Sequence, residues 1–360
     1  MIERKLLLGD EAIALGAIHA GISGVYAYPG TPSTEITEYI QGHAQEVRSR
    51  WCTNEKTAME AALGMSYAGK RALVCMKHVG MNVAADAFVN SAITGVNGGL
   101  VVLAADDPSM HSSQNEQDSR FYGKFAMIPI LEPSTQQEAY DMMKYAYALS
   151  EEKKLPVLLR VVTRLAHSRA GVVVNDLMPQ NALNPDKERT WVLLPAIARR
   201  QYASLVAKQP DLVESSEHSP YNGMNAFEGK AKLGVIACGI GYNYVMENDP
   251  QSLGIPVLKV SQYPLPEASI KALAAQCESL LVAEDGQPLV EEQVKAILGA
   301  DYALKGRLTG DLPRMGELTP DCVGAALGVN IEQPYTEAQN VMPRPPALCQ
   351  GCGHRDVYDA

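Results

Sequence analysis

The chain has 360 residues, of which 46% are apolar and 20% are charged, so it is long enough for two or three globular domains with full cores. Its formal net charge of −10 and its lack of a basic stripe exclude a typical nucleic-acid-binding protein. No apolar run approaches the roughly 20 residues that a membrane span requires, and the first residues do not resemble a signal peptide. We therefore expect a cytoplasmic protein without nucleic-acid or membrane partners.

The first 170 residues alternate apolar runs of strand length with helical periods. Strands are expected over 24–28, 71–76, 99–104 and 156–162, and helices over 9–20, 34–40, 54–68, 83–93 and 135–149. Strand, helix and strand repeated in this way predict an α/β fold with a parallel sheet covered on both faces.

The pattern weakens over residues 171–230, where prolines and charges predict a linker that contains one isolated helix over 194–206. Strand–helix alternation returns over 231–300 and predicts a second, smaller α/β domain. Its expected strands are 233–238, 256–260 and 279–283, and its helices are expected to begin near 242, 269 and 289. Residues 301–360 are rich in loops.

The seven cysteines are scattered, and several of them lie in apolar runs, as Cys75 does. Such a set is not typical of a secreted disulfide framework, so free thiols in a reducing compartment are expected. Cys349 and Cys352 form a Cys-x-x-Cys pair, which is half of a zinc or iron–sulfur site. No second pair exists in the sequence, so a complete cluster needs ligands from outside it. A pair of unligated thiols is the alternative.

The segment 28–35, Tyr-Pro-Gly-Thr-Pro-Ser-Thr-Glu, follows a predicted strand and opens a predicted helix. Thr31 is expected to be the N-cap and Pro32 the first helical residue. Ligands commonly bind at the carboxyl ends of parallel strands, and the free amides of a helix start attract anions. The segment is therefore a candidate anion site, with a plain capped helix as the alternative.

Three further segments carry polar residues at predicted element ends. Glu55 stands at the head of a helix (54–64) whose Ala and Gly residues allow another surface, such as a second subunit, to approach closely. The segment 76–82 contains His78, and a histidine can act as an acid or a base near neutral pH. The segment 104–120 is too polar and too long for a plain turn. For each segment there is an alternative without a function. Glu55 would only favour the helix dipole, His78 would be structural, and 104–120 would be an ordered surface loop.

Taken together and in this order, these segments resemble the alpha subunits of indolepyruvate ferredoxin oxidoreductases, within the thiamine-diphosphate-dependent 2-oxoacid:ferredoxin oxidoreductase family. The resemblance extends over nearly the whole chain. Its most specific stretches are 28–35, 54–64, 76–85 and 106–118, and 283–288, 310–318 and 344–355 also match.

The resemblance implies that residues 1–170 form a pyrimidine-binding domain and that 171–230 link it to a domain over 231–300 like the C-terminal domain of transketolase. Residues 301–360 would lead into a diphosphate-binding domain that is missing or lies on a partner. The implied reaction is the oxidative decarboxylation of an arylpyruvate, such as indolepyruvate, with coenzyme A and with ferredoxin as electron acceptor. The implied partners are a beta subunit and ferredoxin, in an oligomer.

The resemblance implies a role for Glu55, because its place in the motif matches the catalytic glutamate of the family. A carboxyl beside the aminopyrimidine ring favours the imino tautomer, which removes the C2 proton of the thiazolium. Thr31 is expected to orient the substrate carboxylate. The other candidates are the substrate-binding residues His78, His111 and Gln114 and the cofactor-binding residues Pro29, Gly30, Gly80 and Asn82.

The chain departs from the family pattern at the other half of the cofactor site. The family's diphosphate and Mg²⁺ site begins with Gly-Asp and has a later Asn, and no convincing copy is found here; the cysteine array for [4Fe–4S] clusters is also absent. Thiamine diphosphate is therefore expected to bind through its aminopyrimidine, with Mg²⁺ and the clusters mainly outside this chain. Three alternatives stay open: another 2-oxoacid (pyruvate or phenylglyoxylate), a non-redox thiamine-diphosphate decarboxylase component, and a non-catalytic scaffold.

Overall fold

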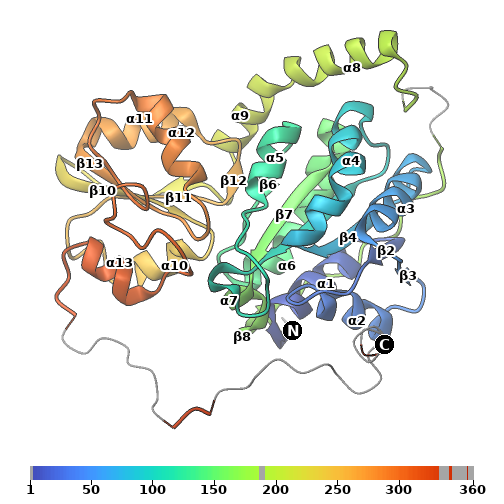
Figure 1. Cartoon of the computed structure of the whole chain (residues 1–360), viewed down its shortest axis with the longest axis horizontal. Coiled ribbons are helices and arrows are strands. Elements are labelled where there is room, and N and C mark those ends of the chain that lie inside the picture. Colours follow the sequence, from blue (N-terminus) through green and yellow to red (C-terminus); the bar gives the residue numbers. More distant parts are fainter. Residues whose placement is uncertain (1–2, 186–190, 332–339, 343–354, 356–360) are drawn as a thin grey trace.

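The N-terminal part of the chain is built around a seven-stranded sheet (Figure 1). The structure, a computed structural model, describes residues 3–185, 191–331, 340–342 and 355. Across the sheet the strands are β12 (Gln262–Tyr263), β6 (Ile130–Leu131), β7 (Val157–Val162), β5 (Leu100–Asp106), β4 (Ala72–Lys77), β2 (Gly24–Ala27) and β3 (Arg48–Trp51). Neighbouring strands are parallel except β12, which runs antiparallel to β6. The predicted α/β fold with a mainly parallel sheet is confirmed.

Helices cover both faces of this sheet, because the central strands carry apolar side chains on both sides. One face packs against α1 (Gly9–His19), α2 (Thr34–His43) and α6 (Gln136–Lys153), and the other against α3 (Glu55–Tyr67) and α4 (His78–Thr94). The short helix α5 (Arg120–Ala126) packs beside α4.

A two-stranded antiparallel ribbon joins the two ends of this first unit. It pairs β1 (Arg4–Leu8) with β8 (Arg169–Val173), so that Leu8 lies opposite Arg169. The chain reaches β8 from β7 through the short helix α7 (Thr163–His167). The start of α1 therefore lies beside the end of α7, and the amide of Gly9 donates a hydrogen bond of 3.2 Å to the carbonyl of Ser168.

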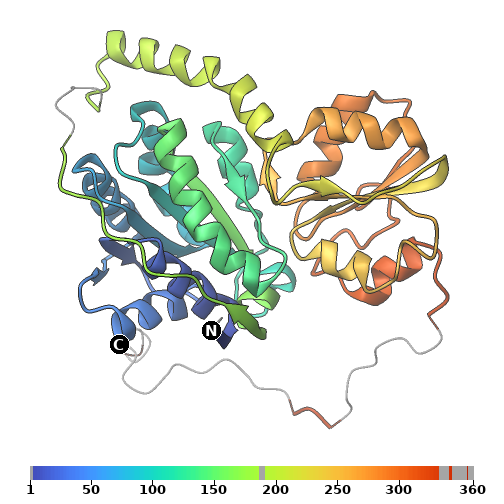
Figure 2. The same ribbon diagram turned by 180° about the vertical axis from the view of Figure 1, so that it is seen from behind.

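A five-stranded sheet forms a second, smaller unit beside the first (Figures 1 and 2). Its strands, in order, are β14 (Leu304–Lys305), β13 (Cys277–Ala283), β10 (Ala231–Cys238), β11 (Val257–Val260) and β9 (Gly223–Met224), all parallel except β9. Its helices are α10 (Gly241–Met246) and α13 (Pro320–Ala326) on one side and α11 (Glu267–Gln276) and α12 (Leu289–Leu298) on the other.

The connection between the two units is more ordered than the sequence predicted. The isolated helix expected over 194–206 occurs as α8 (Pro195–Ala207), but α9 (Gln209–Glu217) continues into the run that was predicted to be a linker. The reason is a tertiary contact: the hydroxyl of Ser216 donates a hydrogen bond of 3.0 Å to the carbonyl of Gln262. Gln262 belongs to β12, so the second unit also contributes a strand to the first sheet.

Most expected elements occur with bounds shifted by a few residues, and the helix expected from Val83 is the main exception. It begins at His78, directly after β4, because the strand runs into the helix without a loop. All five cysteines in the described ranges are free thiols, as expected. No helix within those ranges is both long and apolar enough to cross a membrane.

Candidate active site

The predicted segments meet at one edge of the seven-stranded sheet. β5, β4, β2 and β3 are neighbours and run in the same direction, so the residues that follow them lie along their common carboxyl edge (Figure 1). The segment after β2 contains Gly30, the one after β3 leads to Glu55, and the one after β4 contains His78. The polar loop over 107–119 follows β5.

Glu55 is the first residue of α3, where the side chain of Asn54 caps the helix by accepting a hydrogen bond of 2.9 Å from the amide of Thr57. The Glu55 side chain is half-buried and lies against Gly80 in the first turn of α4. A Cβ atom on Gly80 would lie 2.6 Å from Cγ and 2.7 Å from Oε1 of Glu55. Within the described residues, the Glu55 carboxylate has no hydrogen bond or ion pair, so it is available to a ligand.

The end of β4 holds the polar loop in place. The Lys77 ammonium donates a hydrogen bond of 2.7 Å to the carbonyl of Ser112. The buried His78 ring places Nε2 3.2 Å from both the backbone oxygen and the side-chain oxygen of Asn115. Burial lowers the pKa of Lys77. The third and fourth predicted segments are therefore in direct contact.

The segment after β2 forms a closed turn rather than a helix cap. The amide and hydroxyl of Ser33 donate to the carbonyl of Gly30, and the amide of Gly30 donates to the hydroxyl of Thr34. The helix α2 consequently begins at Thr34, so the expectation of Thr31 as N-cap and Pro32 as first helical residue was wrong. A Cβ atom on Gly30 would lie 3.2 Å from Cβ of Lys77, which brings this turn against the end of β4.

Pro29 and Thr31 are exposed on this turn. Asn82, also exposed, accepts a hydrogen bond from the hydroxyl of Tyr122 and so joins α4 to α5. Thus the first three segments bring Gly30, Glu55 and Gly80 into one region, with polar groups at its border.

His111 and Gln114 lie in the exposed part of the polar loop. Nε2 of His111 lies 3.4 Å from Oε1 of Glu317 in the second unit. Gln114 makes no hydrogen bond within the described residues. The structure therefore does not bring these two candidates to Glu55 by a hydrogen bond or an ion pair. Cys349 and Cys352 lie outside the described residues.

Asp107 holds the loop at its base. Its carboxylate accepts hydrogen bonds from the amide of Ser112 at 2.9 Å, the hydroxyl of Ser113 at 2.5 Å and the hydroxyl of Thr163 at 2.8 Å. Burial opposes the charge, but these hydrogen bonds keep the pKa of Asp107 below its usual range. The loop backbone is therefore anchored to the carboxyl edge of the sheet.

A buried network of charges, which sequence reasoning missed, joins the two units. Arg160 on β7 donates to Asp106 at 2.6 Å, to Glu132, and to the backbone carbonyl of Asp285 at 2.7 Å. The guanidinium has no exposed surface. The available signal was an arginine in the otherwise apolar run 157–162.

Arg120 makes the second set of contacts between the units. It pairs with Asp118 at 2.5 Å and with Glu284 at 2.9 Å. Burial raises the pKa of Glu284 to about 7, although Arg120 opposes that shift. Burial alone would raise the pKa of Asp118, but the positive charges of Arg120 and Arg160 outweigh this effect and hold the pKa at about 2. The segments 106–118 and 283–288, singled out in the sequence, therefore meet at this boundary.

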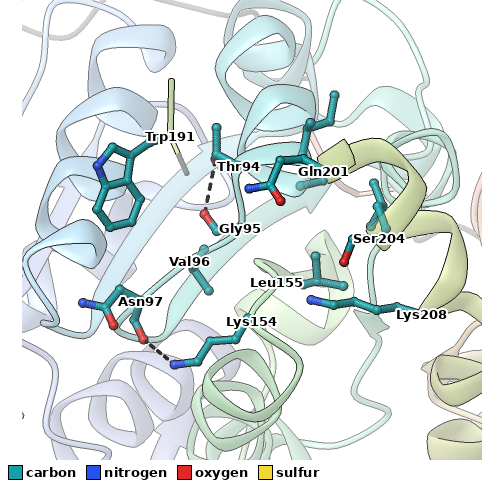
Figure 3. A pocket seen from close by; sticks show the side chains of 13 residues that line it. Thr94, Gly95, Val96, Asn97, Lys154, Leu155, Trp191, Gln201, Ser204 and Lys208 are labelled. Atoms are coloured by element: carbon teal, nitrogen blue, oxygen red, sulfur yellow. Dashed lines mark hydrogen bonds between the residues drawn. The ribbon is translucent and has the colours of Figure 1, made fainter. Parts of the chain in front are cut away.

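A cavity of about 450 Å³ lies at the opposite edge of the first sheet (Figure 3). It is lined by the end of α4, by Lys154 and Leu155 before β7, by Trp191 and by α8. Sequence reasoning singled out none of these residues. Part of its lining lies directly before β5 and β7, whereas the Glu55 region follows its strands, so this cavity is separate from the Glu55 region.

Comparison with known proteins identifies the family. The model of the family described as pyruvate flavodoxin/ferredoxin oxidoreductase, thiamine diphosphate-binding, matches residues 15–211. The chain belongs to this family. The matched region is described as thiamine-diphosphate-binding, and it covers the Gly30, Glu55 and Gly80 segments.

Among curated relatives, the chain is 41% identical to an indolepyruvate oxidoreductase subunit IorA from Archaeoglobus fulgidus, over 99% of this chain and 60% of that protein. The chain thus spans about three fifths of this relative. Among solved structures it is similar to a 2-oxoglutarate:ferredoxin oxidoreductase from Magnetococcus marinus, with a TM-score of 0.72 and 16% identity over 91% of this chain and 65% of that one. A split-gene transketolase matches with a TM-score of 0.58 and 14% identity over 89% and 97% of the two chains. These likenesses confirm the fold of a pyrimidine-binding domain followed by a transketolase-C-terminal-like domain.

Proposed function

We propose that this chain binds the aminopyrimidine half of thiamine diphosphate in an enzyme that oxidatively decarboxylates arylpyruvates, such as indolepyruvate, with coenzyme A and ferredoxin. The observation that carries the substrate class is the 41% identity to an indolepyruvate oxidoreductase subunit over 99% of the chain. In this proposal, residues 1–170 bind the pyrimidine and residues 231–300 form the transketolase-like domain. Residues 171–230 link the two. Residues 301–360 lead toward the diphosphate-binding part.

The geometry around Glu55 supports a ligand that meets its carboxyl. Gly80 has no side chain at the point where Glu55 lies, and Gly30 has none where the first turn meets Lys77. Glycine at these positions lets the Glu55 side chain pack against the start of α4 and the first turn pack against the end of β4. The half-buried Glu55 carboxyl, without a partner in the described residues, is a suitable group to exchange a proton with a ring nitrogen.

Thiamine diphosphate, when bound, supplies the electron sink that allows a 2-oxoacid to lose carbon dioxide. The role of Glu55 is to hold the proton that sets the tautomer of the aminopyrimidine. Thr31 is assigned to the substrate carboxylate, since its side chain is exposed at the carboxyl edge of the sheet. Pro29, Gly30, Gly80 and Asn82 are assigned to the cofactor, and His78, His111 and Gln114 to the substrate side.

The remaining parts of the reaction are assigned to the rest of the assembly. The diphosphate, its Mg²⁺ and the [4Fe–4S] clusters are proposed to be held mainly outside this chain, with Cys349 and Cys352 as a candidate half site. A beta subunit and ferredoxin are the proposed partners, in a cytoplasmic oligomer. The relatives' name, which describes a subunit, supports a partner subunit.

The test is an anaerobic assay of the intact protein with its partner subunit. Indolepyruvate, phenylpyruvate and pyruvate are each supplied with coenzyme A and a viologen dye, and dye reduction is followed. The two arylpyruvates should reduce the dye faster than pyruvate does. Faster turnover of pyruvate would favour another 2-oxoacid, carbon dioxide release without dye reduction would favour a decarboxylase, and no turnover of any acid would contradict the proposal.

A further inference from the structure

Three ionisable side chains meet behind the turn that carries Thr31. Nε2 of His167 lies 3.8 Å from Oδ2 of Asp10 and 3.7 Å from Oε1 of Glu35. One ligand atom from each of the three residues lies within 4.8 Å of the other two. None of them belongs to the Glu55 region described above.

The fold brings these residues together by backbone contacts. Since β1 pairs with β8, Asp10 at the start of α1 and His167 at the end of α7 lie close to each other. Gly9 allows the tight approach, because a Cβ atom there would lie 2.1 Å from the carbonyl oxygen of Leu165. Glu35 is added from the first turn of α2, which packs on α1.

The buried carboxylate of Asp10, which has no hydrogen-bond partner, points to a ligand. Its side chain has no exposed surface, and neither carboxylate oxygen has a hydrogen-bond partner in the described residues. A buried carboxylate in this state is strongly unfavourable unless a proton or a cation neutralises it. Burial, followed by the charge of Glu35, raises the pKa of Asp10 well above its usual range.

Glu35 and His167 leave the cluster open on one side. The Glu35 and His167 side chains are 38% and 35% exposed, so an ion can enter and can keep water ligands. One oxygen of Glu35 is also buried without a partner. Around a tetrahedral ion with ligand distances of about 2.0–2.2 Å, ligand atoms are roughly 3.4 Å apart, so small rotations of these two side chains would complete the geometry.

We propose that Asp10, Glu35 and His167 bind a divalent transition-metal ion. Two carboxylates balance its charge, and the imidazole favours a transition metal over Mg²⁺. The ion would tie together the starts of α1 and α2 and the end of α7. None of these three residues is assigned to the proposed reaction, and none contacts Glu55 or Gly80 through a hydrogen bond or an ion pair in the described residues.

The intact protein is first dialysed to equilibrium against Zn²⁺ and an excess of Mg²⁺. The zinc bound per chain is then measured by mass spectrometry. We expect D10N and E35Q each to bind about one Zn²⁺ fewer per chain than the unsubstituted protein. The control H218Q, which alters a solvent-exposed His218–Glu214 pair with a separation of 2.7 Å, should keep the full count.

Thermal unfolding gives a second readout that does not depend on activity. Zn²⁺ should raise the melting temperature of the unsubstituted protein and of H218Q, but not of D10N or E35Q. Because Glu35 is partly exposed, E35Q is expected to fold even if D10N does not. Equal zinc content in the unsubstituted protein and E35Q would overturn the proposal. The cluster would then be one in which a proton, not a metal ion, neutralises Asp10.

Discussion

The Glu55 side chain occupies the space where Gly80 has no side chain. A Cβ atom on Gly80 would lie 2.6 Å from Cγ of Glu55, although Glu55 begins α3 and Gly80 lies in the first turn of α4. The backbone of α4 thereby determines where the Glu55 carboxyl lies.

Replacing Glu55 by Gln should abolish most turnover in the assembled protein. The change keeps the shape of the side chain but removes the group that exchanges a proton, so we expect a loss of about 100-fold or more in kcat. The measurement is the anaerobic dye-reduction assay with indolepyruvate. E38Q, at an exposed position on α2, is the matched control and should keep normal turnover. Unchanged turnover of E55Q would support the scaffold alternative.

Replacing Gly80 by Ala should reduce activity without unfolding the protein. The new methyl group would meet the flexible side chain of Glu55 and displace its carboxyl, while Ala is favoured over Gly in a helix by about 1 kcal/mol. We expect at least a tenfold loss of kcat and an equal or higher melting temperature. G42A is the control, because a Cβ atom at Gly42 in α2 meets nothing within 4 Å and should leave kcat unchanged.

Replacing Arg160 by Met should strongly destabilise the fold. It would leave the buried carboxylates of Asp106 and Glu132 without their shared cation, a change that typically costs about 3–5 kcal/mol. Urea unfolding measures the loss. The control R164M removes a partly exposed pair with Glu317 and should cost less than about 1 kcal/mol. Equal effects of both substitutions would show that the buried network does not stabilise the boundary.

Replacing Glu284 by Gln should change how stability depends on pH. Burial raises the pKa of Glu284 to about 7 from a usual value of 4.5, so the folded state binds this proton more tightly than the unfolded state. This contribution to stability is complete below the unfolded pKa and is lost as the pH rises through about 7.

The free energy of unfolding of E284Q, minus that of the unsubstituted protein, should therefore increase from pH 5 to pH 8. The expected change is on the order of 3 kcal/mol, measured by urea unfolding at a series of pH values. E278Q, at an exposed position of β13, the strand that directly precedes Glu284, should follow the unsubstituted profile. A constant difference across this range would show that Glu284 is ionised throughout.

Local patterns in the sequence were enough to predict the α/β class, the helix headed by Glu55 and the strand that ends before His78. These features depend on apolar periodicity and on residues next to each other in the chain. The helix expected over 34–40 does begin at Thr34, but the same local reasoning also placed an N-cap at Thr31, whereas the turn at Gly30 is closed by Ser33 and Thr34.

The sequence by itself therefore determined the elements and the edge of the sheet at which the candidate residues gather, since parallel strands place their carboxyl ends together. Only the tertiary structure decided which of them touch. It placed Gly80 against Glu55, turned His111 toward Glu317, and surrounded Arg160 with buried carboxylates. The physical reason is that these contacts depend on strand order and on the packing between the two units. Neither of these can be predicted from local periodicity in the sequence.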